Sequence, residues 1–301
     1  MADKLNDFLG GLDSELAKVI HAILDQTDMV HEELPHRRGK AGTENVYGEE
    51  QKALDVWTND VFVDKLQKTG VVRAIVSEEL GEPWINPNNT GGYVVSIDPL
   101  DGSSNIESNN SFGTIVGVHK QKDMLTPARN LECAFYNLYG PITTAVIAHK
   151  GMVNEFVKYR KGSTEYHLGK ADIKLPEPGK LMGLGGTPKK WTKPVKEFVD
   201  YMIAAKMKVR YGGAFVGDIN QILYYGGCFL YPELEDKPEG KLRLVIECGP
   251  MSYVIETAGG ASTNGTQSIL DMVPTHPDQR APVYLGNRDL VRKFEEIKAK
   301  K

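Results

Sequence analysis

The stretch YVVSIDPLDGSSN, residues 93–105, joins a run of apolar residues to two closely spaced aspartates. The apolar run predicts a buried strand, and Pro99 prevents the chain from continuing as a helix after Asp98. Asp101 follows three residues later, and the Gly-Ser-Ser sequence after it is a flexible turn that can start a helix. Because α/β folds place their sites at the carboxyl ends of strands, this stretch predicts an α/β protein with its site here.

The residues of this turn suit a metal ion beside a phosphate group. Hard divalent cations such as Mg²⁺ need oxygen ligands, which Asp98, Asp101 and the Leu100 carbonyl can supply from one turn. Ser103 and Ser104, with N–H groups at a helix N-terminus, suit a phosphate. For the bare D-P-x-D-G motif, a turn without any ligand is an equal alternative. The preceding strand and the DGSS sequence favour the site.

Two further acidic groups follow apolar strands elsewhere in the chain. Glu78 and Glu79 end the run AIVSEE, and adjacent strand residues face opposite ways, so one can ligate a metal while the other points to a water. Glu247 ends the predicted strand LRLVIE, with Lys241 and Arg243 alternating upstream on one face. Taken singly, a glutamate pair is usually solvated surface, and a lone acid such as Glu247 is usually a cap or a salt-bridge partner.

These strand ends would gather four or five negative charges if they converge. Such a cluster repels itself unless cations neutralise it, so it predicts two or three Mg²⁺ ions about 4 Å apart. Ions in this arrangement polarise a phosphoryl oxygen and lower the pKa of an attacking water. The sequence therefore predicts hydrolysis of a phosphate ester.

The order of the predicted elements divides the chain into two parts. The first half is expected to contain an amphipathic helix from Leu12 that ends before Pro35, a loop over residues 35–48, a second helix and then mostly strands. After a Pro- and Gly-rich segment, helices alternate with short strands. These helices are predicted at about residues 192–206, 214–225 and 250–258 and from Asn287. We predict domains at 1–178, with a mixed sheet carrying the metal loop, and at 179–301, with an α/β arrangement.

Composition and charge exclude several other classes of protein. The 301 residues are 41% hydrophobic, which is ordinary for a globular chain and unlike a disordered or collagenous one. A formal charge of −4 provides no positive field for nucleic acid or an anionic membrane. The three cysteines, odd in number and without a C-x-x-C pair, argue against a disulfide framework or a zinc knuckle. With neither a signal peptide nor a long apolar run, the chain is predicted to be cytoplasmic.

Longer strings of the sequence resemble a known family. The EE pair, the DPLDGSSN segment and the late acid before an AGG helix resemble the Mg²⁺-dependent sugar and inositol phosphatases. Within that superfamily, GTENVYGEEQKALDVWTND, PARNLECAFYNLYG, FLYP, GKLRLVIECGPMSYVIETAGG and DQRAPVYLG are similar to class I fructose-1,6-bisphosphatase, from about residue 40 to the C-terminus. The resemblance implies a layered α-β-α-β-α fold and hydrolysis of the 1-phosphate of fructose 1,6-bisphosphate. It also implies Mg²⁺, replaceable by Mn²⁺ or Zn²⁺, and a homotetramer in gluconeogenesis.

The resemblance assigns roles to individual acidic residues. Asp55 and Glu79 match the pair that positions and deprotonates the attacking water. Glu49 stands where the family has an aspartate, on a mobile loop, that helps to hold a third metal ion. The implied metal ligands are Glu78, Asp98, Asp101, Glu247 and the Leu100 carbonyl.

The resemblance also implies how the sugar bisphosphate is bound. Ser103 and Ser104, which follow Gly102, match the site of the phosphate that is cleaved. Arg210 matches an arginine that reaches the distal phosphate from a neighbouring subunit, which implies a homo-oligomer. The residues expected to hold the distal phosphate and sugar are Tyr211, Tyr231 and Lys241, and Arg243 joins the substrate-binding set. As plain alternatives, Tyr231 is a packed strand end, and Arg210 and Lys241 are solvated charges.

Two segments depart from the family pattern. KLMGLGGTPKKW, residues 180–191, lacks the Asn and Tyr that help to grip the distal phosphate, and it looks closer to sedoheptulose-1,7-bisphosphatase. The Thr-Gly-Glu segment that binds inhibitory AMP in the animal enzymes has no clear match before Leu12. Gly92 replaces a lysine of that AMP site, although Tyr93 and Arg129 persist. We therefore predict weak or absent inhibition by AMP.

Other functions stay open at this point. Either fructose or sedoheptulose bisphosphate can be the preferred substrate. An inositol monophosphatase shares the EE and DPxDG pieces, but it typically carries Trp-Asp where this chain has Ile246 and Glu247. A non-catalytic sensor of polyanions or nucleotides would use the Gly-rich segments 183–186 and 212–213, but such clusters are more often turns.

Overall fold

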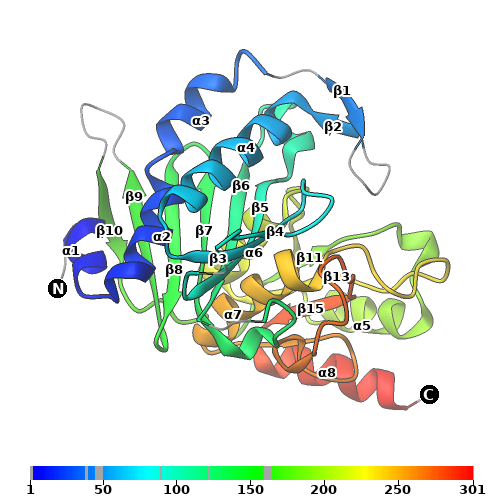
Figure 1. Ribbon diagram of the computed structural model, residues 1–301. Coiled ribbons are helices and arrows are strands. Elements are labelled where there is room, and N and C mark those ends of the chain that lie inside the picture. Colours follow the sequence, from blue (N-terminus) through cyan, green and yellow to red (C-terminus); the bar gives the residue numbers. More distant parts are fainter. Residues whose placement is uncertain are drawn as a thin grey trace.

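The two larger β-sheets alternate with three layers of helices in the computed structural model (Figure 1). The structure describes residues 3–37, 40–44, 50–88, 90–120, 123–158 and 165–300. The α-helices are α1 (Leu5–Gly10), α2 (Ser14–Leu24), α3 (Thr27–Glu33), α4 (Ala53–Lys68), α5 (Lys193–Ala204), α6 (Phe215–Tyr225), α7 (Gly249–Thr257) and α8 (Arg288–Ala299).

The larger sheet has eight strands in the order β10-β9-β8-β7-β6-β5-β3-β4, and it is mixed because β3 and β5 run parallel. The smaller sheet has the order β12-β11-β13-β15-β14. The strands of the larger sheet are β3 (Val72–Ser77), β4 (Trp84–Ile85), β5 (Tyr93–Asp101), β6 (Phe112–His119), β7 (Leu131–Tyr139), β8 (Thr143–His149), β9 (Met152–Lys158) and β10 (Tyr166–Lys170). Those of the smaller sheet are β11 (Leu181–Leu184), β12 (Lys208–Val209), β13 (Gly227–Tyr231), β14 (Ala261–Thr263) and β15 (Val283–Gly286).

Helices α1 to α4 cover one face of the larger sheet (Figure 1). Helix α2 begins after Asp13, whose carboxylate accepts hydrogen bonds from the backbone N–H groups of Glu15 and Leu16 at 3.0 and 3.2 Å. That cap satisfies donors that would otherwise lack partners at the start of the helix. The buried face of α2 then packs with strand residues such as Val95 and Ile97, which anchors the helix to the sheet.

Helices α6 and α7 lie between the two sheets, and α5 and α8 cover the outer face of the smaller sheet (Figure 1). The core between the sheets joins side chains of the larger sheet, such as Tyr136, to residues of α6 and α7 and to Phe229 of β13. The outer core joins Phe198 of α5 to Phe294 of α8, with ring centroids 5.3 Å apart. The expected α-β-α-β-α layering is confirmed.

Residues 244–247, expected to end a strand, instead begin a π-helix, η4 (Leu244–Cys248), that leads into α7. The backbone N–H of Cys248 donates to the carbonyl of Arg243, five residues earlier, at 3.0 Å. A short apolar run is compatible with either a strand or a buried helix, so its periodicity did not distinguish them. The wider turn brings Arg243 and Glu247 onto one side of the chain, where both line a pocket.

Two other expectations about the first half are corrected. The segment 35–48 was expected to be a loop, but part of it forms β1 (Lys40–Glu44), which pairs antiparallel with β2 (Glu50–Lys52). The single helix expected before Pro35 is divided into α2 and α3, because the chain turns at Asp25 and Gln26.

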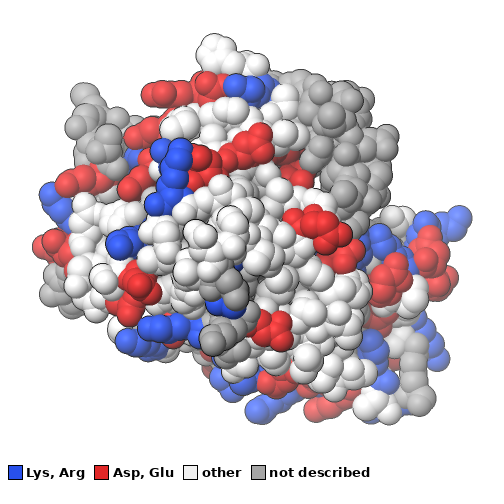
Figure 2. Space-filling model, in the orientation of Figure 1, with Lys and Arg blue, Asp and Glu red and all other residues white. Residues whose placement is uncertain are grey.

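Figure 2 shows acidic and basic side chains mixed over the face in view. Among the described residues, no helix has the length and apolar character needed to cross a membrane.

Candidate active site

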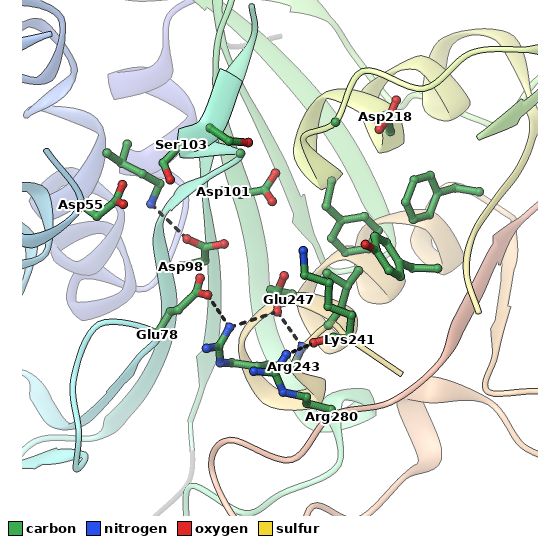
Figure 3. A pocket seen from close by; sticks show the side chains of 18 of the residues that line it. Asp55, Glu78, Asp98, Asp101, Ser103, Asp218, Lys241, Arg243, Glu247 and Arg280 are labelled. Atoms are coloured by element: carbon green, nitrogen blue, oxygen red, sulfur yellow. Dashed lines mark hydrogen bonds and ion pairs between the residues drawn. The ribbon is translucent and has the colours of Figure 1, made fainter. Parts of the chain in front are cut away.

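Three buried carboxylates converge where β5 ends and η4 begins (Figure 3). Asp98, Asp101 and Glu247 each present an oxygen, and these oxygens all lie within 4.8 Å of one another. The backbone N–H of Leu100 donates to Asp98 Oδ1 at 3.0 Å, and that of Arg243 donates to Glu247 Oε2 at 2.6 Å. These bonds hold the acidic side chains in place although their charges repel.

Burial makes ionisation of these carboxyl groups unfavourable. It raises the pKa of Asp98 well above its ordinary value, with further increases from the negative charges of Glu78 and Asp101. It raises the pKa of Asp101 to about 7 and that of Glu247 to about 8. Because desolvation and mutual repulsion both favour the neutral acids, this arrangement is stable in its charged form only next to positive charge.

Arg243 brings positive charge into the cluster. Its guanidinium is buried, forms an ion pair with Glu78 and lies 4.0 Å from Glu247 Oε2 (Figure 3). Asp98 Oδ1 is also held by the chain, since Leu100 N–H donates to it. Converging oxygens with no nitrogen or sulfur donor suit a hard divalent cation such as Mg²⁺, so the donor set fits the predicted metal.

Asp55 and Glu79 lie at the same pocket, on α4 and after β3. One helical turn beyond Asp55, the side chain of Asn59 accepts a hydrogen bond from Ser77 Oγ at 2.7 Å. This bond ties α4 to the end of β3, immediately before Glu78 and Glu79. Asp55 and Glu79, which were expected to position and deprotonate the attacking water, therefore line the same pocket as the acidic cluster.

The DGSSN segment forms a tight turn that opens into a 3₁₀ helix, Ser103–Ile106. Gly102 has a φ of 77°, and a Cβ there would lie 2.3 Å from Ala214 Cβ, so only glycine fits. Thr114 of the neighbouring strand β6 stabilises the turn, because its hydroxyl donates to the Pro99 carbonyl at 2.9 Å. Gly102, Ser103 and Ser104 all line the same pocket as the carboxylates.

The other end of the pocket is lined by tyrosines and cations. Tyr211 and Tyr231 interact through their side chains, and burial raises the pKa of Tyr211 to about 12. The Lys241 ammonium lies 5.7 Å from the centroid of the Tyr231 ring. The Lys241 cation and the tyrosine hydroxyls suit an anion.

The structure brings most of the predicted site residues together. The pocket is lined by Asp55, Glu78, Glu79, Asp98, Leu100, Asp101, Gly102, Ser103, Ser104, Tyr211, Tyr231, Lys241, Arg243 and Glu247. Glu49 lies outside the described residues. Arg210 is exposed and does not line this pocket; its guanidinium lies 5.0 Å from the Tyr225 ring and donates to Gln221 at 3.4 Å.

Sequence reasoning missed two charged residues that line the pocket, Asp218 and Arg280 (Figure 3). Asp218 accepts a hydrogen bond from Gly212 N–H at 2.6 Å, and burial raises its pKa to about 6. An acid in the first turn of a helix after Gly-Gly is a recognisable capping signal that could have drawn attention to it. Arg280 donates to the Lys241 carbonyl, a contact that joins distant segments and leaves no local signal.

Comparison with known families identifies the class of protein that has this fold and pocket. Residues 3–169 match the model of the fructose-1,6-bisphosphatase N-terminal domain. Residues 175–299 match the model of the C-terminal domain. The chain belongs to the fructose-1,6-bisphosphatase family.

Individual relatives are similar to this protein over most of its length. The class 1 fructose-1,6-bisphosphatase of Pelobacter propionicus is 45% identical over 261 residues, which cover 86% of this chain and 80% of that protein. The class 1 enzyme of Halobacterium salinarum is 40% identical over 273 residues, which cover 91% and 93%. The holo form of Leishmania major fructose-1,6-bisphosphatase superposes with a TM-score of 0.91 at 30% identity and covers 98% of this chain and 99% of that one.

Proposed function

We propose that this protein hydrolyses the 1-phosphate of fructose 1,6-bisphosphate to give fructose 6-phosphate and phosphate. The observation that carries this proposal is a single pocket with buried carboxylates at one end and tyrosines with Lys241 at the other. A substrate with one phosphate at each end needs both. The family relationship described above supports the same reaction.

In the proposed site, Mg²⁺ would be held by Glu78, Asp98, Asp101, Glu247 and the Leu100 carbonyl. Bound there, the metal ion would supply positive charge that stabilises phosphoryl oxygens and makes a water more acidic. Asp98, Asp101 and Glu247 are already gathered by hydrogen bonds from the backbone. Because the backbone already holds these carboxylates in position, they need little rearrangement when the metal ion and the substrate bind.

The remaining pocket residues bind the substrate and direct the water. We assign Asp55 and Glu79 to orienting the attacking water and accepting its proton, a general-base role. The backbone N–H groups and hydroxyls of Ser103 and Ser104 would hold the phosphate that leaves. Tyr231 and Lys241 would hold the distal phosphate and so fix the register of the sugar.

A matched pair of variants on helix α4 tests the reaction and the assignment of Asp55. Asp55 is buried at the pocket, whereas Asp64 is exposed on the same helix and pairs with Lys68. With fructose 1,6-bisphosphate and excess Mg²⁺, Asp55→Asn is expected to lower kcat by about 10²–10⁴-fold with little change in KM. Asp64→Asn is expected to match the wild type. A wild type that releases no phosphate from fructose 1,6-bisphosphate would refute the proposal.

Sedoheptulose 1,7-bisphosphate is the second candidate substrate. The specific observation in its favour is the segment after β11, where Gly185 and Gly186 replace bulkier groups expected near the distal phosphate. Measuring kcat/KM for both bisphosphates decides between them. A ratio above one for the seven-carbon sugar would change the preferred substrate but not the reaction.

We also propose that the protein acts as a homo-oligomer, with a tetramer as the expected size. Arg210 is exposed and follows the edge strand β12, and its guanidinium lies over the ring of Tyr225, which is 47% exposed. An exposed arginine against an exposed aromatic ring combines two residue types that are enriched at protein interfaces. Light scattering of the wild type and of Arg210→Ala, together with KM for the bisphosphate, tests whether the residue acts across subunits.

A further inference from the structure

Two glycines, Gly183 and Gly185, lie in an extended segment that borders the pocket. Gly183 is part of β11, and Gly185 continues the pairing with β13, because its N–H donates to the Leu230 carbonyl at 2.8 Å. Neither has a positive φ, whereas the next residue, Gly186, has a φ of 77°. The first two glycines are therefore not required by the backbone conformation, and another property must explain them.

The rings of Phe229 and Tyr231 lie directly over these glycines. A Cβ built on Gly183 would be 2.7 Å from Phe229 Cδ2, and one built on Gly185 would be 2.6 Å from Tyr231 Cδ2. Two further ring atoms of Tyr231 would lie 2.9 Å from that Cβ. Alternate residues of a strand face the same side of a sheet, so both glycines leave bare backbone under the aromatic rings that line the pocket.

Tyr231 connects the other residues at this end of the pocket. Its side chain interacts with that of Tyr211, and its ring faces the ammonium of Lys241 at 5.7 Å. The Lys241 carbonyl in turn accepts a hydrogen bond from Arg280. A displacement of the Tyr231 ring would therefore move the hydroxyl and the cation that face the substrate.

We infer that Gly185 is a positioning residue for the distal phosphate and that it acts through Tyr231. The inference rests on the proposed function, which assigns the distal phosphate to this end of the pocket. The missing Cβ lets the Tyr231 ring lie against the backbone just after β11, where the ring also faces the Lys241 ammonium. In this packing, a Cβ at residue 185 fits only if the Tyr231 ring shifts from its present position.

The test compares Gly185→Ala with Gly10→Ala, a matched control in which the added methyl group meets no atom within 4 Å. Calorimetry measures the affinity for fructose 6-phosphate, which carries only the distal phosphate and needs no turnover. Hydrolysis of p-nitrophenyl phosphate reports on the carboxylate end alone. The same measurements are made with Gly185→Ala in a Tyr231→Ala background.

Gly185→Ala is expected to weaken fructose 6-phosphate binding about tenfold, the scale of one lost cation–π contact with one hydrogen bond. The KM for fructose 1,6-bisphosphate is expected to rise similarly, while turnover of p-nitrophenyl phosphate stays within about twofold of the wild type. Once Tyr231 is alanine, the added methyl group is expected to have no further effect.

Wild-type affinity in Gly185→Ala, or a further loss in the Tyr231→Ala background, would overturn the inference. An equal loss of activity with fructose 1,6-bisphosphate and with p-nitrophenyl phosphate would also overturn the inference, because it would indicate a general disturbance of the fold. Failure of the proposed function is a separate result, since it requires that the wild type leave fructose 1,6-bisphosphate intact. The ratio of fructose 6-phosphate affinities tests Gly185 in either case.

Discussion

Raising the pH from 5 to 8 is expected to destabilise the protein when divalent cations are removed with EDTA. Asp98, Asp101 and Glu247 are buried together, and burial raises all three pKa values above those of the unfolded chain. Between the unfolded and folded pKa values the folded state binds more protons. The free energy of unfolding therefore falls as the pH rises through the folded pKa values.

Asp101 sets the scale of this loss. Its pKa rises from 3.8 to about 7. Between pH 5 and this folded pKa lie about two pH units, which correspond to about 2.7 kcal/mol. The three carboxyl groups share one repulsion, so their individual costs do not add. At an unfolding entropy of about 0.6 kcal/mol/K for a chain of this length, a loss of about 2.7 kcal/mol lowers Tm by about 4–5 °C.

Thermal unfolding at pH 5 and pH 8, with EDTA or with Mg²⁺, measures the effect. Mg²⁺ is expected to recover the loss at pH 8 and to add little at pH 5, because protonated carboxyl groups are poor ligands. Glu247→Gln, which can still accept the Arg243 N–H, is expected to reduce the pH dependence, whereas Asp64→Asn is expected to retain it. Equal Mg²⁺ stabilisation at both pH values, or a Glu247→Gln variant with the full loss, would refute the reasoning.

Three further outcomes are expected. AMP at millimolar concentration is expected to leave turnover unchanged, because Tyr93 donates to Asp13 at 3.1 Å and the Arg129 guanidinium is engaged by Asp271; a full inhibition curve would contradict this. Thr114→Val removes the hydrogen bond to the Pro99 carbonyl, so the Mg²⁺ concentration for half-maximal activity is expected to rise several-fold, with recovery in Thr114→Ser. An unchanged Mg²⁺ requirement in Thr114→Val would show that this bond does not support the metal loop. The three cysteines are buried with raised pKa values, so a thiol reagent is expected to react at the rate of unfolding, and rapid labelling of the folded enzyme would disagree.

The acidic half of the candidate site could be predicted from local sequence. Asp98 and Asp101 follow an apolar strand within one turn, and Glu78 and Glu79 follow its parallel neighbour, so strand pairing alone brings these ends together. The α-β-α-β-α layering was implied by the family resemblance and is confirmed. The alternation of strands and helices in the second half gave a coarser indication of it.

Other pocket residues depend on contacts between distant segments, which the local sequence does not indicate. Asp218 faces the pocket only because Gly212 and Gly213 turn back over the start of α6. Arg280 reaches it through the carbonyl of Lys241, 39 positions earlier in the chain. The run 244–247 is short and wholly apolar before its glutamate, so the sequence could not distinguish a strand from the π-helix that forms.

The side chain of Asp101 is held by helix α6, which follows much later in the sequence. Its carboxylate accepts the N–H of Val216, 115 residues further on, at 2.6 Å, and Asn105 donates to the Gly212 carbonyl at 2.8 Å. A growing chain that ends after the large sheet thus has the donor to Asp98, which is Leu100 N–H, but lacks the Val216 N–H that orients Asp101. The geometry of the acidic cluster therefore depends on the second half of the chain as well as on the strand that carries Asp98 and Asp101.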